Sequence, residues 1–345
     1  MAVFRPPASP TRRSLLTAGG AAALAAALAA CGGGDDDGDG EAAGGSGGAW
    51  RFEDDRGRTA KARATPKRIV AYVASAAALH DFGVECVGVF GPATYRDGRP
   101  TPQAGALDVK KLTTVGGASF GDFNIEKYAA LRPDLLVSNM NQPGLLWQVP
   151  DDSADKIYRL APSVGIRTAH VSLVRTIQRY GELAAALGAD LGADRVVSAK
   201  SRFERAAERL RRAAHAKKGI RVVAVATQPA ALSVGAPGAF PDTRYFAELG
   251  VEFVKPRKPG KPGFWSPVSW ENVDAYAADV IFADRRSNNM PLDEVARSKP
   301  TWGTLPAVKA GQVVPWNNEA QFSYAGYAPL IERFAQALEN AKKVT

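Results

Sequence analysis

Short apolar runs alternate with amphipathic runs in the part of the chain that follows residue 50. The apolar runs are rich in valine and are bounded by turn residues, which predicts buried β-strands. Ser75 is placed to cap the first helix, and Gly83 is placed to stop it. This order predicts a mostly parallel sheet covered by helices on both faces. The predicted strands are residues 68–73, 84–90 and 135–138, and the predicted helices are residues 75–82 and 124–131.

The middle of the chain has the spacing of helices rather than strands. Residues 176–187 predict an amphipathic helix that Gly188 ends, and residues 193–217 follow without proline or glycine. At about 1.5 Å per residue the second helix would reach ~37 Å, long enough to cross between two lobes. Its apolar stripe consists of Val196, Val197, Phe203, Ala206, Ala207, Leu210 and Ala213.

The alternation of strands and helices then restarts. We expect strands at residues 221–226 and 278–283, a turn and strand at residues 308–314, and helices at residues 243–249, 268–273 and 329–343. The fold class is therefore α/β, with two α/β halves joined by a long helix. The expected divisions are an N-terminal lobe at residues 50–172, a helical segment with the interlobe helix at residues 173–218, and a C-terminal lobe at residues 219–345.

The first 49 residues have the composition of a targeting signal followed by a tether rather than that of a folded domain. Residues 1–31 combine a basic start with an apolar run that is short for a bilayer, as in a secretory signal peptide. Residues 9–16 resemble a twin-arginine export signal, and residues 28–31 (LAAC) resemble a bacterial lipobox. That resemblance implies lipidation of Cys31. Residues 32–49 are rich in glycine, aspartate and alanine, which predicts a flexible tether.

Charge and cysteine content narrow the function classes. The whole chain carries a net charge of +9, and the part from residue 50 onward carries +11. No nucleic-acid recognition motif accompanies this charge, so it favours anionic ligands or headgroups. Cys86 has no partner once Cys31 is lipidated, and we expect it to be buried. The three histidines lie far apart in sequence, and no metal-binding motif occurs.

Several stretches resemble the iron-siderophore and cobalamin solute-binding lipoproteins of ABC importers. They are residues 68–70, 82–84, 87–89, 124–137 and 302–313. The resemblance implies two doubly wound lobes bridged by a rigid helix, with a ligand cleft between them outside the carboxyl ends of the strands. It also implies that a glutamate on each lobe docks to the permease. Glu248 fits this role in the C-terminal lobe, whereas the corresponding N-terminal position is Ala77, for which Asp81 or Glu85 could substitute.

A bulky chelate needs aromatic walls and a few arginine donors, and loops after strands can supply both. We favour Trp265 as an aromatic wall, and Arg285 over Arg286 as the cleft arginine. Tyr72 could instead pack in the core, and Tyr95 and Arg96 could form an exposed loop tip. The full set of candidates is Tyr72, Tyr95, Arg96, Asn139, Met140, Trp265, Arg285, Trp316 and Tyr324.

The resulting expectation is a monomeric, lipid-anchored extracytoplasmic receptor for a ferric siderophore, working with an ABC permease and ATPase. Iron would be held by the siderophore, so the protein needs no metal ligands, cofactor or catalytic residues. The small number of arginines favours a hydroxamate over a highly charged catecholate. Cobalamin stays open, and heme is less favoured because no candidate cleft loop contains histidine. An exported enzyme lacks a visible catalytic set, and an adhesion lipoprotein is a further alternative.

Overall fold

The computed structural model describes residues 48–345 except residues 118 and 258. The predictions for the signal peptide, for Cys31 and for nearly all of the tether fall outside the described residues. None of the described helices combines the length and the apolarity needed to span a bilayer. The fold begins with an unpredicted antiparallel hairpin of β1 (Trp50–Glu53) and β2 (Thr59–Ala62). The indole Nε1 of Trp50 holds it in place by donating to the Ala186 carbonyl at 2.8 Å.

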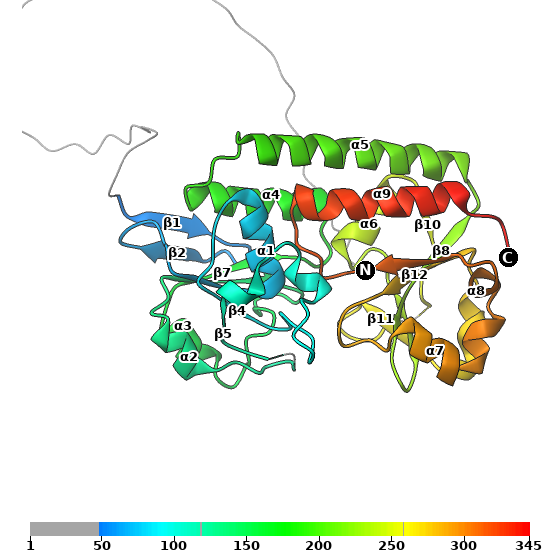
Figure 1. Cartoon of the computed structure of the whole chain (residues 1–345), viewed down its shortest axis with the longest axis horizontal. Helices are drawn as coiled ribbons and strands as arrows, with labels where there is room; N and C mark the ends of the chain where they lie inside the picture. Colours follow the sequence, from blue (N-terminus) through cyan, green and yellow to red (C-terminus); the bar gives the residue numbers. More distant parts are fainter. Residues whose placement is uncertain (1–47, 118, 258) are drawn as a thin grey trace, which may run out of the picture. The chain divides into compact units, whose positions relative to one another are not determined.

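The N-terminal lobe is built on a five-stranded parallel sheet (Figure 1). Its strands are β3 (Ile69–Tyr72), β4 (Gly88–Phe90), β5 (Thr113–Thr114), β6 (Leu135–Met140) and β7 (Ser163–Arg167). Its helices are α1 (Val73–Phe82), η1 (Pro102–Ala104), η2 (Val109–Lys111), α2 (Ile125–Ala130) and α3 (Ala154–Tyr158). The strand order is β5-β4-β3-β6-β7, with β3 in the centre. The chain adds β4 and β5 on one side of β3 and then adds β6 and β7 on the other side. Every residue of β3 and β6 is buried, as expected for parallel strands covered on both faces.

Helix α1 differs from the prediction at its start and agrees at its end. It begins at Val73, directly after β3, so Ser75 lies inside the helix rather than capping it. The Ser75 hydroxyl lies 2.6 Å from the Tyr180 hydroxyl, which is a buried tertiary contact. The predicted stop is confirmed, because Gly83 has φ of +100°, a conformation that side chains disfavour.

The C-terminal lobe has a mixed sheet, which the sequence pattern did not predict. Its strands are β8 (Arg221–Thr227), β9 (Leu232–Gly235), β10 (Glu252–Phe253), β11 (Trp265–Val268), β12 (Val280–Asp284) and β13 (Val313–Trp316). The main path is β11-β9-β8-β12-β13, and β10 pairs with β8. Strands β8, β12 and β13 are parallel, whereas β9 and β11 run antiparallel to their neighbours. The helices of this lobe are α6 (Pro241–Glu248), η3 (Trp270–Tyr276), α7 (Leu292–Ser298), η4 (Pro300–Thr304) and α8 (Pro306–Lys309).

A layer of helices joins the lobes. It contains α4 (Leu173–Ala186), α5 (Asp194–Ala216) and α9 (Tyr324–Asn340). The predicted long helix is confirmed as α5, whose 23 residues span about 34 Å and lie across both lobes in Figure 1. Its predicted apolar stripe is buried except for Val197, which is 50% exposed. Helix α9 packs along α5, and Arg202 and Arg209 pair with its Glu332 and Glu339, each at 2.6 Å.

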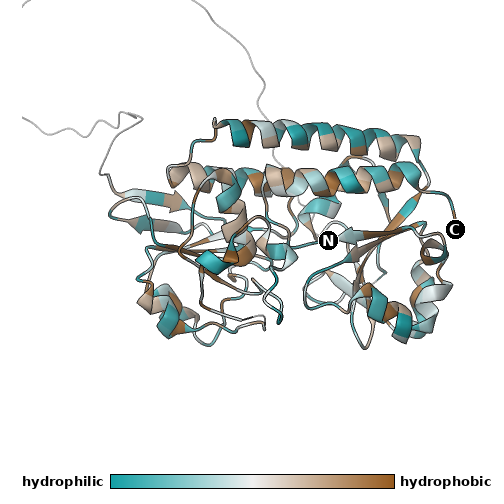
Figure 2. Ribbon diagram, in the orientation of Figure 1, coloured by the Kyte–Doolittle hydropathy of each residue, from teal (hydrophilic) through white to brown (hydrophobic). Residues whose placement is uncertain are grey.

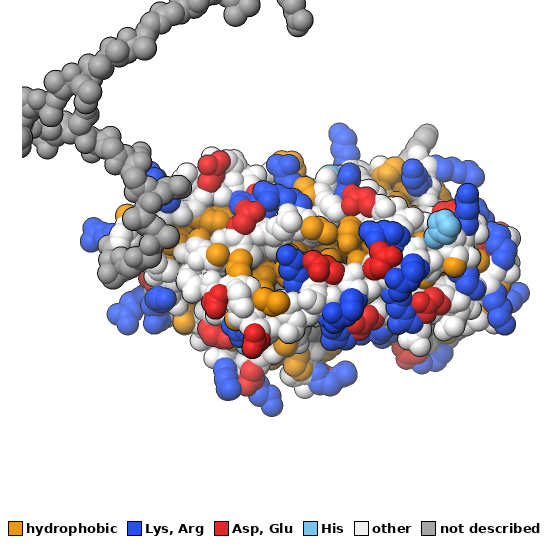
Figure 3. All heavy atoms as spheres, turned by 90° about the horizontal axis from the view of Figure 1, so that it is seen from above, with side chains coloured by type: hydrophobic (Ala, Val, Ile, Leu, Met, Phe, Trp, Pro, Cys, Tyr) orange, Lys and Arg blue, Asp and Glu red, His pale blue; other side chains and the backbone are white. Residues whose placement is uncertain are grey.

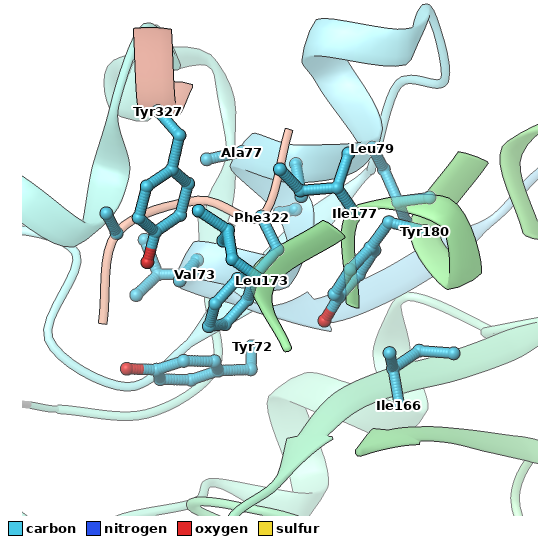
Figure 4. Packing of buried hydrophobic residues seen from close by; sticks show 14 of the residues in the cluster. Tyr72, Val73, Ala77, Leu79, Ile166, Leu173, Ile177, Tyr180, Phe322 and Tyr327 are labelled. Carbon is cyan, nitrogen blue, oxygen red and sulfur yellow. The ribbon is translucent and has the colours of Figure 1, made fainter. Parts of the chain in front are cut away.

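Residues 317–323, which we call the crossover segment, connect β13 to α9 and pack against the N-terminal lobe. Phe322 stacks on Tyr180 with ring centroids 6.3 Å apart, and Figure 4 shows it among residues of α1 and α4. Ser323 caps α9 by accepting from the Gly326 amide at 2.9 Å and donates to Asp81 at 2.5 Å. Helix α9 therefore starts at Tyr324, not at residue 329 as the sequence suggested.

One continuous hydrophobic core runs from the N-terminal sheet through the helical layer to one face of the C-terminal sheet. A second, smaller core lies on the other face of that sheet. Figure 2 shows the sheets as mainly hydrophobic and α5 as largely hydrophilic. Because the shared core crosses between the lobes, their relative placement is fixed by packing as well as by α5.

Candidate ligand cavity between the lobes

The strand order in each sheet indicates where a ligand would bind. The order changes direction between β3 and β6 in the N-terminal sheet, and between β8 and β12 in the C-terminal sheet. Open α/β sheets bind ligands outside the carboxyl ends of strands at such points. A cavity of about 220 Å³, open to solvent, lies there. It is lined by Asn139, Asn141, Gln142, Trp147, Thr168, Phe240, Pro241, Gly260, Lys261, Pro262, Phe264, Trp265, Arg286, Asn318, Glu319 and Phe322.

Aromatic rings form much of the cavity wall. Trp265 packs against Phe240 with ring centroids 4.9 Å apart, and Phe264 lies 5.3 Å from Phe240. Trp265 belongs to β11, paired with Gly235 of β9, and not to a loop as predicted. A Cβ at Gly235 would stand 3.2 Å from the Phe240 ring and 3.3 Å from the Trp265 ring. The absence of a side chain there lets both rings pack against the strand.

A buried ion-pair network occupies the base of the cavity. Arg286 donates through Nε to Asp284 Oδ2 at 2.7 Å and through Nη1 to Glu319 Oε1 at 2.5 Å. Asn289 also donates to Asp284, at 2.8 Å. The Tyr72 hydroxyl donates to the other Glu319 oxygen. The network thus links the end of β3, the crossover segment and the residues after β12.

Burial controls the protonation of this network. Burial raises the pKa of Tyr72 well above its usual value, and the adjacent Glu319 raises it further. Burial alone would lower the pKa of Arg286, but Asp284 and Glu319 outweigh that effect and raise it. Burial also raises the pKa of Asp284, although Arg286 opposes the shift. The arginine is therefore charged, and its charge is met by carboxylates of the protein.

A second buried acid, Asp242, lies at the start of α6. Its Oδ2 accepts from the Trp316 indole at 2.6 Å, and its Oδ1 accepts from the Thr243 amide at 2.7 Å. Burial raises the pKa of Asp242 from 3.8 to about 7, partly offset by the Trp316 hydrogen bond. Trp316 packs on Trp265 with centroids 5.9 Å apart, so this acid supports the aromatic wall from behind.

Amide side chains provide neutral donors and acceptors in the N-terminal half of the cavity. Asn139 Oδ1 accepts from the Tyr180 hydroxyl at 2.5 Å and from Ser75 at 3.3 Å. Its amide nitrogen has no protein partner within the described part of the chain, so it is available to a ligand. Thr168 donates to Asn141 Oδ1 at 2.5 Å, which fixes the orientation of that second amide.

The nine predicted ligand residues fall into three groups. Asn139 and Trp265 line the cavity. Tyr72 and Trp316 are buried behind the lining, where they contact Glu319 and Trp265 respectively. The other five lie outside the lining and are Tyr95, Arg96, Met140, Arg285 and Tyr324.

The residues outside the lining have clear structural surroundings. Tyr95 is in a tight turn and lies under the Arg99 guanidinium, 5.4 Å from its ring centroid. Met140 is 2% exposed and points toward Gly165. Tyr324 packs between Phe82 and Phe203 on the helical side of the molecule.

The choice between the two arginines after β12 goes against the prediction. Arg286 lines the cavity, whereas Arg285 is exposed and makes no ion pair with a described residue. The reason is the buried Asp284 at the end of β12, which draws the guanidinium two residues later back toward the sheet.

Sequence reasoning missed several lining residues, among them Trp147, Thr168, Phe240, Glu319 and Phe322. Thr168 follows β7, a strand that was not predicted, so it could have been found by the same rule as Asn139. His170 lies two residues further on, with its ring 5.7 Å from Phe264. His170 is not itself a lining residue, and its loop was not among the candidate cleft loops.

The predicted docking residue lies away from the cavity. Glu248 is exposed at the carboxyl end of α6, and its carboxylate accepts from the Ser172 hydroxyl at 2.8 Å. Ser172 caps α4, so this hydrogen bond joins the two lobes on the side of the helical layer. Replacing Glu248 would therefore remove an interlobe contact as well as a charge.

Comparisons with known proteins agree with this geometry. The model of a family described as periplasmic binding protein matches residues 71–320. The chain is similar to DesE, a ferric-siderophore receptor protein from Streptomyces coelicolor, with 46% identity and a TM-score of 0.83. That match covers 86% of this chain and 100% of DesE. The comparison with curated proteins gave no match.

More distant structures share the fold. A siderophore periplasmic binding protein from the fuscachelin gene cluster of Thermobifida fusca is 24% identical, with a TM-score of 0.57 over 80% of this chain and 97% of that one. Staphylococcus aureus SirA, complexed with staphyloferrin B, is 19% identical, with a TM-score of 0.58 over 85% of this chain and 99% of that one.

Proposed function

Because the chain belongs to the family of periplasmic binding proteins, we propose that it captures a ferric siderophore and delivers it to the permease and ATPase of an ABC importer. The observation that carries the proposal is the interlobe cavity, whose walls combine aromatic rings with neutral amides and a single half-buried arginine. Such walls suit a bulky chelate that has apolar arms and polar edges. The identity with the ferric-siderophore receptor DesE, which extends over the whole of that chain, supports the same ligand class.

Charge favours a hydroxamate siderophore over a catecholate. Three hydroxamates cancel the charge of ferric iron, whereas three catecholates leave a strongly negative complex. The charge of Arg286 is already met by Asp284 and Glu319, so the base of the cavity offers no free positive charge. Lys261 at the cavity wall is exposed and would be a weak partner in water. A neutral complex would therefore lose less on entering the cavity than an anionic one.

In this proposal the protein contributes no ligand to the iron, needs no cofactor and performs no catalysis. The siderophore fills the metal's coordination sphere. The free energy of binding comes from stacking on Trp147 and Trp265 and from hydrogen bonds to groups such as Asn139. The rigid connection between the lobes supports this view, because a prearranged wall loses little conformational entropy when it binds.

We place the protein outside the cytoplasm as a monomer, anchored through Cys31 after removal of residues 1–30. The basic and apolar start of the chain and the lipobox-like residues 28–31 support this placement. Docking to the permease through Glu248 stays part of the proposal, with its Ser172 hydrogen bond as a complication that the test has to include.

The test is a binding series with a neutral ferric tris-hydroxamate, a ferric tris-catecholate, each chelator without iron, cobalamin and hemin. Quenching of tryptophan fluorescence reports on binding, because two of the six tryptophans, Trp147 and Trp265, line the cavity. We expect the ferric hydroxamate to bind at least tenfold more tightly than the catecholate and than its own iron-free form. Preference for hemin, lost in His170→Ala, would replace the siderophore proposal with a heme one. Binding of cobalamin alone would replace it with a cobalamin receptor.

A further inference from the structure

The outward face of α5 carries an unusual concentration of positive charge. Residues 194–218 contain nine basic and three acidic side chains, a net charge of +6, out of +11 for the chain from residue 50 onward. About half of the net charge of the folded part thus lies on one helix and the turn after it. Figure 3 looks down on this side of the molecule and shows many Lys and Arg side chains, with Asp and Glu side chains lying among them. We call the exposed members the basic ridge: Arg195, Lys200, Arg202, Arg205, Arg211, Arg212 and Lys218.

Packing explains only part of this ridge. Arg202 pairs with Glu332 of α9, as Arg209 does with Glu339, and these pairs hold the two helices in register. Arg205 and Lys200 form no ion pair with a described residue, and Arg211 and Arg212 share the single carboxylate of Glu208.

The spacing of the arginines works against the helix itself. Arg202, Arg205, Arg209 and Arg212 follow one another at intervals of three and four residues, which sets like charges side by side on one surface. Like charges at these intervals destabilise a helix. The buried stripe of α5, with Phe203 and Leu210, would pack as well if the outward positions were neutral. A partner of opposite charge accounts for the ridge better than folding does.

We propose that the basic ridge is a membrane-contact surface that rests on a bilayer containing anionic phospholipids. Guanidinium groups bind phosphate through two parallel hydrogen bonds, and basic side chains near an anionic bilayer are attracted to its surface. The choice of a bilayer as partner rests on the lipid anchor proposed above for Cys31. Eighteen residues lie between Cys31 and Trp50, and even a fully extended chain of that length spans only about 65 Å. The folded part is therefore held next to lipid headgroups, which raises their effective concentration at the ridge.

Such a contact is compatible with ligand capture. No residue that lines the interlobe cavity belongs to α5 or α9. A receptor resting on its basic ridge would keep the cavity accessible to ligands. It would have to leave this resting orientation in order to present the cavity to a permease.

The test compares binding of the full, non-lipidated chain to two kinds of vesicle. One kind contains phosphatidylcholine alone, and the other contains equal parts of phosphatidylcholine and phosphatidylglycerol. The apolar residues 15–30 are the same in every variant, and the phosphatidylcholine vesicles measure their contribution. The test variant combines Lys200→Gln, Arg205→Gln and Arg212→Gln. The matched control combines Lys110→Gln, Lys156→Gln and Lys309→Gln, three exposed lysines on η2, α3 and α8 that form no ion pair with a described residue.

We expect the wild-type chain to prefer the anionic vesicles, with a preference that weakens as salt is added. One basic side chain close to an anionic surface typically strengthens binding roughly fivefold. The test variant should therefore bind at least tenfold more weakly, while the control, with the same net charge, stays close to wild type. Equal losses in both variants would mean that net charge alone matters and would overturn the proposal. So would a wild-type chain that shows no preference for phosphatidylglycerol. Siderophore binding, measured on the same preparations, separates either failure from a failure of the proposed function.

Discussion

Replacing Trp265 with alanine would remove one wall of the interlobe cavity. The side chain is half-buried in β11, and its inner edge packs on Phe240 and Trp316 with centroid distances of 4.9 and 5.9 Å. Its remaining face lines the cavity. The residue therefore has two roles, one in the aromatic cluster of the lobe and one toward the ligand.

The loss of binding free energy can be estimated from the area of the Trp265 side chain that a ligand covers. If a ligand covers about 60 Å² of the exposed face, burial contributes ~1.5 kcal/mol at ~25 cal/mol per Å². Aromatic stacking adds roughly 0.5–1.5 kcal/mol. The alanine variant should therefore bind about thirtyfold or more weakly. Losing the contacts with Phe240 and Trp316 should also lower the melting temperature by several degrees.

Calorimetric titration and thermal unfolding, run on the same samples, separate these effects. Trp270→Phe is a matched control, because Trp270 is 6% exposed in the smaller core of the same lobe and lies outside the cavity lining. The control should lose stability and keep its affinity. If Trp265→Ala shows the same behaviour as the control, Trp265 is a packing residue and the assignment of the cavity wall is refuted.

Four further predictions test other parts of the molecule. Cys31→Ser should leave an unprocessed precursor or release the protein into the medium, and a mature-sized product that still fractionates with membranes would contradict the lipid anchor. Glu248→Ala should lower uptake without changing siderophore affinity, whereas Ser172→Ala, which removes the same hydrogen bond and keeps the charge, should leave uptake unchanged; unchanged uptake at equal abundance in Glu248→Ala would remove Glu248 from permease docking. Arg286→Gln should weaken binding at least tenfold and destabilise the fold by leaving buried carboxylates unpaired, whereas Arg285→Gln should change affinity less than twofold; a folded Arg286→Gln variant with wild-type affinity would place Arg286 outside the site. Because burial raises the pKa of Asp242 from 3.8 to about 7, the folded state keeps a proton that the unfolded state releases, so the contribution of Asp242 to stability should fall as pH rises between those values. The difference in stability between wild type and Asp242→Asn should change by about 1.4 kcal/mol per pH unit, and parallel stability curves would contradict this.

The long helix and the central strands were predictable because local pattern decides them. Helix α5 has a continuous apolar stripe and no proline or glycine, and β3, β6, β8 and β12 each contain a run of at least three consecutive apolar residues. Strands β9 and β11 were missed, since they contain small, polar and proline residues and are held in place by pairing with each other. The start of α9 was misplaced because Pro329 looks like a helix start. The cap that decides the start is Ser323, whose hydroxyl is also bonded to Asp81 of the distant α1.

The sequence predicted the position of the cavity more accurately than it predicted the residues that line it. The rule that ligands bind beyond the carboxyl ends of strands found Asn139 directly. Trp147 and Phe322 come from segments whose sequence carries no such signal, and they reach the cavity only through tertiary packing. The sequence could not show whether Arg285 or Arg286 lines the cavity. The outcome depends on which of the two guanidinium groups reaches the buried carboxylate of Asp284, and that is set by the fold.

The crossover segment has a consequence for how a permease could tell a loaded receptor from an empty one. Glu319 is bonded to the N-terminal lobe through Tyr72 and to the C-terminal lobe through Arg286, and Phe322 of the same segment is packed inside the N-terminal lobe. A wide opening of the lobes would break this buried network, so empty and loaded receptors should have nearly the same outline. Recognition of the loaded state would then depend on the ligand's own surface at the cavity mouth. Empty receptors would consequently compete with loaded ones for the same permease, and the rate of uptake would depend on the fraction of receptors that carry ligand as well as on their total number.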